Sequence, residues 1–302
     1  MKRVLLTGAS GFIGRFCIEP LAARGFEVHA VSSRPPAVDE GPAAWHRHDL
    51  LAEGEAARVI EIVRPTHVLH LAWYAAPRAF WIAPENLDWV RASLAMLRAF
   101  ERTGGERFVG AGTGAEYAAG DADCVEGVTP LAPSTLYGVC KHAVHAVLES
   151  FAAGRFSAAW GRIFHLYGPE EEPSRLVPTV INALLSGRDA ECTVGTQVRD
   201  FIHVADLGDA FAALVASPVE GAVNVASGRA VRLADLITGI GVQMNAPERI
   251  RLGARPMPAG ELPRVTASVA RLRDEVGWTS ARELDRGLAE TIAWWRQQHS
   301  RR

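Results

Sequence analysis

The chain has 302 residues, 48% of them hydrophobic and 22% charged, which is typical of one large globular unit or of two units that share an interface. Its formal net charge is −2, so it is not expected to bind nucleic acid or an anionic membrane surface. It has no apolar run near the roughly 20 residues of a membrane span and no signal-peptide pattern, so no membrane insertion is expected. Its four cysteines are too scattered for zinc or a disulfide framework, so we expect a cytoplasmic protein; they are Cys17, Cys124, Cys140 and Cys192.

A glycine-rich turn follows the first expected strand, Val4 to Thr7, and precedes a helical pattern that reaches about Arg24. Gly8 permits the tight turn, Gly11 lets the backbone approach a pyrophosphate, and Gly14 lets the helix pack on the strand. The free N–H groups at the start of the helix suit the phosphates. The pattern predicts a dinucleotide site with contacts at Gly8, Ser10, Gly11, Phe12, Ile13 and Gly14.

The end of the second expected strand, Glu27 to Val31, indicates which dinucleotide binds. NAD-binding strands end in Asp or Glu, which accepts from the ribose 2′-OH, whereas this chain continues as Ser32-Ser33-Arg34. Hydroxyls and a guanidinium would hold a 2′-phosphate that a carboxylate would repel. We therefore expect NADP rather than NAD, with a solvated loop arginine as the alternative. Asp49, further along, could accept from the adenine amino group or cap a helix.

Strands and helices alternate along the first half of the chain, which predicts an α/β fold with a doubly wound parallel sheet of the Rossmann type. The strands are expected near Trp45 to His48 and at His67 to Leu71, Phe108 to Ala111 and Ala158 to Ile163, and the helices at Glu55 to Arg64 and Asn86 to Arg102. An aromatic stretch could be a stacking wall for a sugar or base, or simply packing; it contains Trp73, Tyr74, Phe80, Trp81 and Trp89.

Tyr137 and Lys141 are four residues apart in a segment with a helical pattern, so both should lie on one face. A nearby ammonium lowers the pKa of a phenol, which could then exchange a proton with a carbonyl or alcohol oxygen. The chain has only two lysines, so a chance pairing is rare, although a half-buried tyrosine on an ordinary helix is the alternative. His142 and His145 share this helix, but no third ligand is apparent and no metal is expected.

The acidic, proline-containing run Glu170 to Pro173 predicts a crossing into a smaller α+β C-terminal lobe that binds substrate. We expect the dinucleotide domain to span residues 1–164, with 203–228 returning to it, and the lobe to comprise 165–202 and 229–302. The expected elements here are a helix at Leu176 to Ser186, a strand and a helix capped by Asp206, a last helix at Leu284 to Arg296, and a loose tail from Gln297.

Several motifs in this order resemble the extended short-chain dehydrogenase/reductases, and within them the nucleotide-sugar epimerase, dehydratase and 4-ketoreductase group. The resemblance covers nearly the whole chain. It rests on TGASGFIG at the N-terminus, HLA at 70–72, YGVCK at 137–141, RIFHLYGP at 162–169, QVRDFIHVAD at 197–206 and EVGW at 275–278.

The resemblance implies roles for individual residues. Tyr137 would be the acid–base group, Lys141 would hold the nicotinamide ribose, and Thr113 would bind the substrate oxygen. Arg199 would hold the nucleotide diphosphate, with an ion pair to Asp200 or Asp206 as the alternative. Further substrate contacts would come from His165 and Arg255, and further cofactor contacts from Ser32, Ser33, Arg34, Asp49, Leu50, Leu71, Ala72, Lys141 and Phe164.

The chain departs from the family pattern at positions that bear on the reaction. Dehydratases place Asp-Glu after the threonine, whereas Gly114 and Ala115 stand here and cannot move protons, which excludes dehydration. His165 and Trp89 replace asparagines, and the segment around Arg255 is out of the usual register.

We therefore expect an NADP-dependent reductase of the C4 keto group of a nucleotide-linked 4-keto-6-deoxyhexose, a step of deoxysugar biosynthesis. A C4 epimerase is the first alternative, and a non-catalytic NADP-binding regulator is the second. The family also implies a homodimer through the helices at 86–102 and 135–152.

Overall fold

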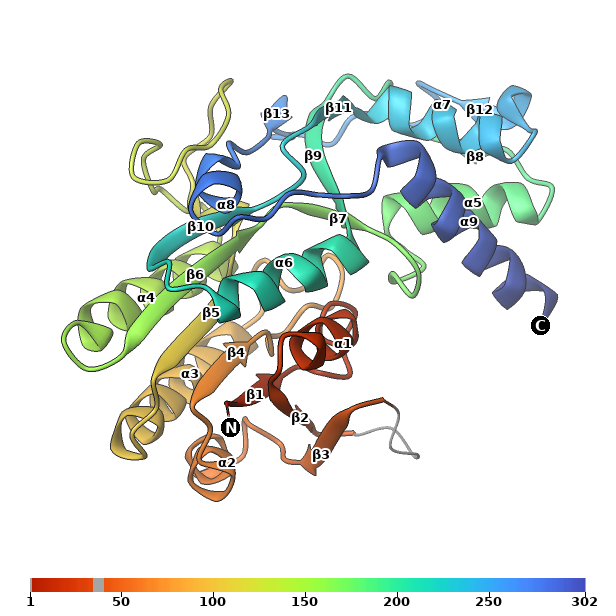
Figure 1. Ribbon diagram of the computed structural model, residues 1–302. Coiled ribbons are helices and arrows are strands. Elements are labelled where there is room, and N and C mark those ends of the chain that lie inside the picture. The colour runs from red at the N-terminus through yellow and green to blue at the C-terminus, as the bar shows by residue number, and fades with distance from the viewer. Residues whose placement is uncertain (1, 35–40, 302) are drawn as a thin grey trace.

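The computed structural model describes residues 2–34 and 41–301, and its central element is a parallel sheet. Within these residues the sheet has seven strands in the order β10-β6-β5-β4-β1-β2-β3, as Figure 1 shows. The strands are β1 (Arg3–Thr7), β2 (Glu27–Ser32), β3 (Ala43–Arg47), β4 (His67–His70), β5 (Arg107–Thr113), β6 (Ser157–Ile163) and β10 (Gly221–Val225). Because β1 pairs with both β2 and β4, the chain reverses its winding there, and ligands bind outside the carboxyl ends of strands at such a point.

Helices cover both faces of the sheet, which confirms the doubly wound α/β fold (Figure 1). One face carries α1 (Arg15–Ala23) and α6 (Val204–Ala216), and buries Phe211 and Leu214 among the strand side chains. The other face carries α2 (Glu55–Val63), α3 (Glu85–Arg102) and α4 (Leu136–Ala152), packed around Phe100 and Phe108. Both layers are apolar because the strands they cover are buried on both sides.

The C-terminal lobe forms its own smaller core around Ile181 and Trp295. It contains β7 (His165–Tyr167), β8 (Ala190–Glu191), β9 (Val198–His203), β11 (Ala230–Arg232), β12 (Ile250–Arg251) and β13 (Arg264–Val265). Its helices are α5 (Leu176–Leu185), α7 (Leu233–Gln243) and α9 (Leu284–Ser300), whereas α8 (Ala270–Asp274) packs on β10 and buries Leu272 in the core of the first domain. The short helices η1 (Gly114–Glu116) and η2 (Pro247–Arg249) lie in loops. Between the lobe segments, α6 and β10 join the first domain, where β10 pairs with β6.

Two expectations for this lobe are wrong. The tail expected from Gln297 is helical, because α9 continues to Ser300. Asp206 does not cap α6: the cap is His203, whose ring nitrogen accepts from the backbone N–H of Ala205. A local pattern cannot distinguish a cap from a buried acid whose partners lie far along the chain.

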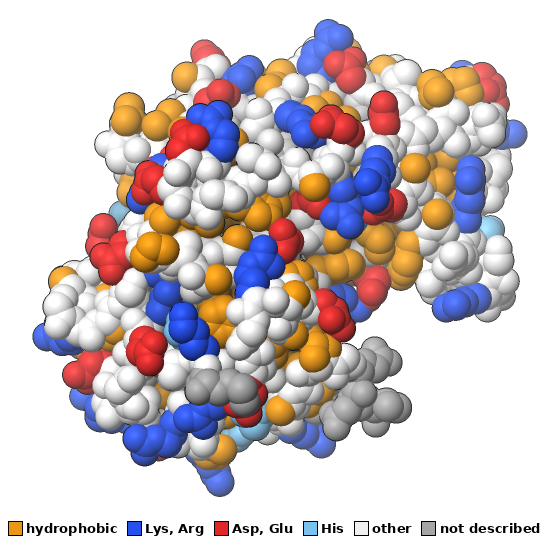
Figure 2. All heavy atoms as spheres, in the orientation of Figure 1, with side chains coloured by type: hydrophobic (Ala, Val, Ile, Leu, Met, Phe, Trp, Pro, Cys, Tyr) orange, Lys and Arg blue, Asp and Glu red, His pale blue; other side chains and the backbone are white. Residues whose placement is uncertain are grey.

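The surface carries charges of both signs. Acidic and basic side chains alternate over the face in Figure 2, without a large patch of either sign. No helix among the described residues is both long and apolar enough to cross a membrane.

Asp206, which does not cap α6, connects this helix to the segment that precedes α9. Its carboxylate, nearly inaccessible to solvent, accepts from Ser280 Oγ at 2.7 Å and from the backbone N–H of Arg282 at 3.0 Å, and pairs with the Arg282 guanidinium. Burial alone would raise the pKa of Asp206, but these hydrogen bonds and the nearby positive charge hold it below its usual value. A carboxyl with a lowered folded-state pKa stabilises the fold above its unfolded-state pKa, and that contribution is lost as pH falls.

Asp206→Asn should lower the free energy of unfolding by about 1–3 kcal/mol at pH 7, because charged hydrogen bonds to a buried acid are lost. Urea unfolding at pH 7 and pH 4 measures this, and the deficit should shrink at the lower pH. Asp235→Asn is the matched control, since its pair with Arg232 is exposed on both sides and should contribute little. Equal effects of the two substitutions would contradict the assignment.

Candidate functional site

The glycine-rich turn after β1 has no room for side chains. Gly8 has φ of +69°, and a Cβ there would lie 2.8 Å from the backbone nitrogen of Ala72 after β4. A Cβ on Gly14 would lie 2.2 Å from the Gly8 carbonyl oxygen. The turn therefore brings bare backbone to the carboxyl ends of β1 and β4, as a dinucleotide pyrophosphate requires. The residues present fit such a cofactor, and Leu71 and Ala72 beside the turn form an apolar wall.

The predicted adenosine end opens into a cavity of about 590 Å³ at the ends of β2 and β3. The Ser32 hydroxyl lies 2.7 Å from Ser10 Oγ and accepts from the backbone N–H of Arg34 at 3.0 Å, so it organises the loop. The cavity is lined by Ser33, Arg34, Arg47, His48, Asp49 and Glu55.

Asp49 is exposed here and accepts from the backbone N–H of Leu51 at 3.1 Å, while Leu50 is buried. Arg47 was not expected at this site from the sequence. The only signal for it was its place at the end of a strand next to β2.

Tyr137 lies in the first turn of α4 and is held by the loop that follows β4. Its backbone N–H donates to the Trp81 carbonyl oxygen at 3.1 Å. Its ring packs edge-on against Phe80, with 4.9 Å between ring centroids, and against Trp81 at 5.8 Å. Its side chain lies close enough to Thr113, the last residue of β5, for the threonine to lower the pKa of the phenol. The structure therefore brings together Tyr137 and Thr113, as the sequence predicted.

Lys141, one turn further along α4, faces protein groups. Its Nζ donates to the Ala111 carbonyl oxygen at 2.8 Å and lies 3.8 Å from the centroid of the Trp73 ring. Burial lowers the pKa of Lys141 to about 7, although the charge of Glu116 opposes this. The ammonium therefore loses part of its charge near neutral pH.

The electrostatics of Tyr137 differ from the expectation. Burial raises the pKa of Tyr137 to about 12; the side chain of Thr113 and the charge of Arg175 lower it, and Glu116 raises it. Lys141 is not among the groups that shift this pKa, so the expected lowering by a neighbouring ammonium is not found in this structure. The physical reason is burial, which lowers the pKa of Lys141 to about 7, well below the pH at which this phenol ionises.

Glu116 is the centre of a buried network below Thr113. Its Oε1 accepts from the Thr113 backbone N–H at 2.8 Å and from Trp160 Nε1 at 2.9 Å. Its Oε2 accepts from Arg162 Nε at 3.0 Å, and Arg162 also donates to Tyr117 Oη at 3.0 Å. Tyr117 in turn donates to Asn224 of β10 at 2.8 Å. The network ties β5, β6 and β10 together directly beneath the predicted site.

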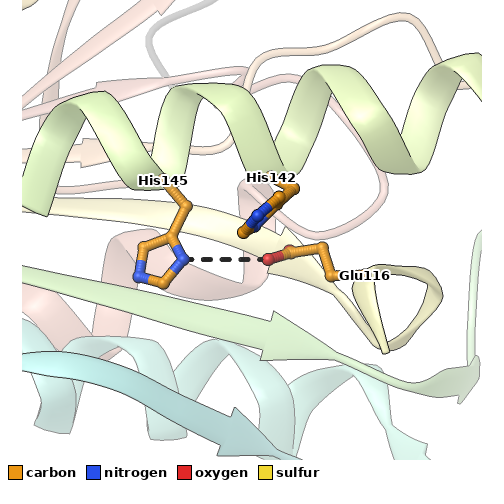
Figure 3. A group of neighbouring side chains, drawn as sticks. All are labelled: Glu116, His142 and His145. Atoms are coloured by element: carbon orange, nitrogen blue, oxygen red, sulfur yellow. Dashed lines mark ion pairs between the residues drawn. The ribbon is translucent and has the colours of Figure 1, made fainter. Parts of the chain in front are cut away.

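Glu116 also supplies the third donor that was not apparent beside His142 and His145 (Figure 3). One ligand atom from each of the three lies within 4.8 Å of the others. However, the Arg162 guanidinium already forms an ion pair with the Glu116 carboxylate, and it also donates to His145 Nδ1 at 3.3 Å. A guanidinium at that point excludes a second cation, so the trio is a structural network.

The residues of the lobe that were predicted to bind substrate do not all lie together. Arg199 is buried and pairs with Glu261, and it donates to the carbonyl oxygen of Leu262 at 2.8 Å. The alternative partners Asp200 and Asp206 are therefore wrong: Asp200 accepts from Ser227 and Gly228, and Asp206 pairs with Arg282.

His165 feels the charges of two arginines. Burial lowers its pKa to about 3, with further lowering by the charges of Arg199 and Arg175. Its Nδ1 is buried and has no hydrogen-bond partner among the residues with described positions. Arg255 is exposed, with its Nε 3.8 Å from Glu191 on β8, which is a surface contact.

The aromatic stretch packs around two of the three predicted catalytic residues, Tyr137 and Lys141. Trp73 stacks on Trp89 with centroids 6.2 Å apart and donates to Asn86 Oδ1 at 2.7 Å. Phe164, a predicted cofactor contact, is buried and packs against Gly114, where a Cβ would lie 3.1 Å from its ring. These contacts show the packing interpretation, while a stacking wall for a sugar or base stays a prediction.

Three site residues were not predicted: Arg47, Glu116 and Arg175. Glu116 follows the residues where dehydratases carry Asp-Glu, and its capping box with Thr113 was a readable signal. Arg175 lies at the N-cap of α5, where sequence alone gives no sign that it faces Tyr137.

The chain is similar to known proteins over most or all of its length. A model described as the NAD dependent epimerase/dehydratase family matches residues 4–226. The dTDP-glucose 4,6-dehydratase of Neisseria gonorrhoeae is 26% identical over 100% of this chain and 97% of that protein. The structure of Thermus thermophilus UDP-glucose 4-epimerase with NAD is 26% identical, with a TM-score of 0.84 over 97% of this chain and 99% of that one. MoeE5 in complex with UDP-glucuronic acid and NAD is 30% identical, with a TM-score of 0.83 over 98% of this chain and 99% of that one.

Glu116→Gln should lower the free energy of unfolding by about 3–5 kcal/mol, because it leaves the buried Arg162 guanidinium without its counter-charge. Urea unfolding of the variant and of the wild type measures the difference. Glu149→Gln on the exposed side of α4 is the control and should change stability little. A nearly unchanged unfolding midpoint for Glu116→Gln would show that Arg162 is compensated elsewhere.

Proposed function

The chain belongs to the NAD dependent epimerase/dehydratase family, and we propose that it transfers a hydride between a nicotinamide cofactor and C4 of the hexose of a nucleotide sugar. The observation that carries the proposal is the proximity of the Tyr137 and Thr113 side chains at the carboxyl end of β5, on the same edge of the sheet as the glycine-rich turn. Two neighbouring hydroxyls can bind one sugar oxygen and move its proton.

In this mechanism Tyr137 donates its phenolic proton to the C4 oxygen as the carbonyl is reduced, and accepts it back in the reverse direction. A bound nicotinamide would supply or accept the hydride. Thr113 orients the oxygen, and its own position is set by the contact of its backbone N–H with Glu116. Lys141 is proposed to exchange the Ala111 carbonyl for a cofactor ribose hydroxyl.

The net reaction that we propose is NADP-dependent reduction of the 4-keto group of a nucleotide-linked 4-keto-6-deoxyhexose. Support comes from the adenosine end, where Ser33 and Arg34 rather than an acid follow β2. Ser33, Arg34 and Arg47 line the cavity there together with His48, Asp49 and Glu55. Two guanidiniums and a hydroxyl suit a 2′-phosphate. The solved relatives bind NAD, and that would be the cofactor of the second candidate.

The second candidate is C4 epimerisation with retained NAD. Support comes from the relatives, which include the UDP-glucose 4-epimerase of Thermus thermophilus with NAD. Dehydration has no support at Gly114 and Ala115, and the adjacent Glu116 has both carboxylate oxygens occupied. A carboxylate already paired with a guanidinium is a poor proton donor.

The nucleotide diphosphate is proposed to lie beside His165 and Arg199, which requires Glu261 to move off the guanidinium.

We also propose a cytoplasmic homodimer through α3 and α4, which lie side by side. Their outer faces expose Leu87, Val139 and Val147.

Tyr137→Phe should reduce kcat/KM by about 100- to 10,000-fold while cofactor binding is kept, because only the transferred proton is lost. NADPH oxidation is measured against GDP-, CDP-, UDP- and dTDP-linked 4-keto sugars. Tyr167→Phe, which loses only a 3.4 Å hydrogen bond to Leu284 in the lobe, is the control. Full activity of Tyr137→Phe would contradict the mechanism, and tightly retained NAD without NADPH consumption would favour the epimerase.

The double substitution Arg34→Gln with Arg47→Gln should weaken NADPH binding about 10- to 100-fold and leave NADH binding nearly unchanged, because only NADPH carries the 2′-phosphate. Quenching of tryptophan fluorescence on titration measures both affinities. Arg102→Gln on α3 is a control for the loss of a positive charge away from the cavity, since Arg102 pairs with Glu61 and both side chains are about half exposed. Tighter binding of NADH than NADPH by the wild type would overturn the assignment of NADP.

A further inference from the structure

Arg175 reaches from the lobe toward the reacting tyrosine. It is the N-cap residue of α5, and its guanidinium carbon lies 5.6 Å from the centroid of the Phe80 ring. Phe80 in turn packs edge-on against Tyr137 with 4.9 Å between centroids. The guanidinium, the phenyl ring and the phenol are therefore in series, and they come from three separate segments of the chain. This arrangement fixes a cation on the lobe side of Tyr137.

The charge of Arg175 is not cancelled by a carboxylate partner in the part of the chain that the structure describes. The carboxyl whose charge interacts with it is Glu171, the fourth residue before it. Burial raises the pKa of Glu171 to about 8, although Arg175 itself opposes the rise. Glu171 is therefore less able than an ordinary carboxyl to offset the charge of Arg175 at pH 7, whereas an arginine stays protonated at any working pH. Arg175 keeps a full positive charge beside the site.

The cation that the sequence suggested for this role is less able to perform it. Lys141 is committed to the Ala111 carbonyl and the Trp73 face, and its charge is partly lost near neutral pH. The charged groups that act on the Tyr137 phenol are Glu116, from below, and Arg175. Of these two, only Arg175 favours the phenolate.

We propose that Arg175 is a positioning residue for the reaction, whose permanent charge, held in series with Phe80 and Tyr137, stabilises the phenolate that Tyr137 becomes on giving up its proton. This rests on the proposed function of Tyr137. During reduction the hydride adds to C4, the C4–O π electrons become the bond to the phenolic proton, and the negative charge remains on Tyr137. In oxidation the same phenolate takes the proton of the C4 hydroxyl. Arg175 lowers the cost of that charge in either direction.

The test is the ionisation of Tyr137 itself, which needs no sugar substrate. The chain has four tyrosines, so ¹³C label at tyrosine Cζ gives few NMR signals, and Tyr137→Phe identifies the one of interest. The titration is made with saturating NADP⁺, because the positively charged ring of the cofactor would lower the pKa of the phenol toward the range in which the protein stays folded. Arg175→Gln should raise the apparent pKa of Tyr137 by about 0.5–1 unit, as expected for one charge several ångströms away in a partly aqueous site. Arg175→Lys should restore most of the shift.

Arg188→Gln is the matched control, an exposed arginine just beyond α5 with the same change of charge. It should leave the Tyr137 titration unchanged. An unchanged titration in Arg175→Gln would overturn the proposal, as would equal shifts in the two Gln variants.

A kinetic measurement separates this role from substrate binding. With the sugar nucleotide found active in the screen, Arg175→Gln should lower kcat about 5- to 10-fold at neutral pH, leave KM nearly constant and move the pH profile upward. A raised KM with an unmoved pH profile would show that Arg175 is a substrate contact instead, and would overturn the proposal. If no sugar nucleotide reacts, the proposed function fails, while the NMR titration still decides the role of Arg175.

Discussion

The buried pair of Glu116 and Arg162 is the interaction on which the site depends. Glu116 has no solvent contact, so its charge is tolerable only because Arg162, Trp160 and the Thr113 backbone all donate to it. Those donors come from the end of β5 and from β6, the neighbouring strand. One carboxylate therefore sets the end of β5, and through it the hydroxyl that meets Tyr137. Removing that charge would cost both stability and the alignment of two hydroxyls.

The rest of the site is gathered by the topology of the sheet. In a parallel sheet the carboxyl ends of neighbouring strands lie along one edge, so the turn after β1, the loop after β4 and the end of β5 meet. The loop after β4 then reaches α4, where the Trp81 carbonyl satisfies the free backbone N–H of Tyr137. A single hydrogen bond thus connects the aromatic loop to the helix that carries the acid–base candidate.

Two side chains that the family resemblance assigns to ligand binding already have protein partners in this structure. Lys141 donates to the Ala111 carbonyl, and Arg199 pairs with Glu261. An unpaired buried charge is costly, so each cation needs an oxygen whether or not a ligand supplies it. A ligand that binds Lys141 or Arg199 would replace a protein oxygen with one of its own. Its affinity would therefore depend more on how well its oxygens are placed than on the charge of the cation. Arg175 differs because it is exposed and its charge remains available.

Much of the fold could be predicted from local pattern. The strand, glycine turn and helix at the N-terminus, the rhythm of the sheet and the helical placement of Tyr137 with Lys141 follow from periodicity and from a backbone conformation at Gly8 that favours glycine. The partners of charged groups could not be predicted in this way. Arg199 meets Glu261, Arg282 meets Asp206 and Arg175 faces Tyr137 across the junction of the two lobes. Periodicity reports which face of an element is buried, whereas the partner of a charge depends on which distant segments the packing brings within a few ångströms.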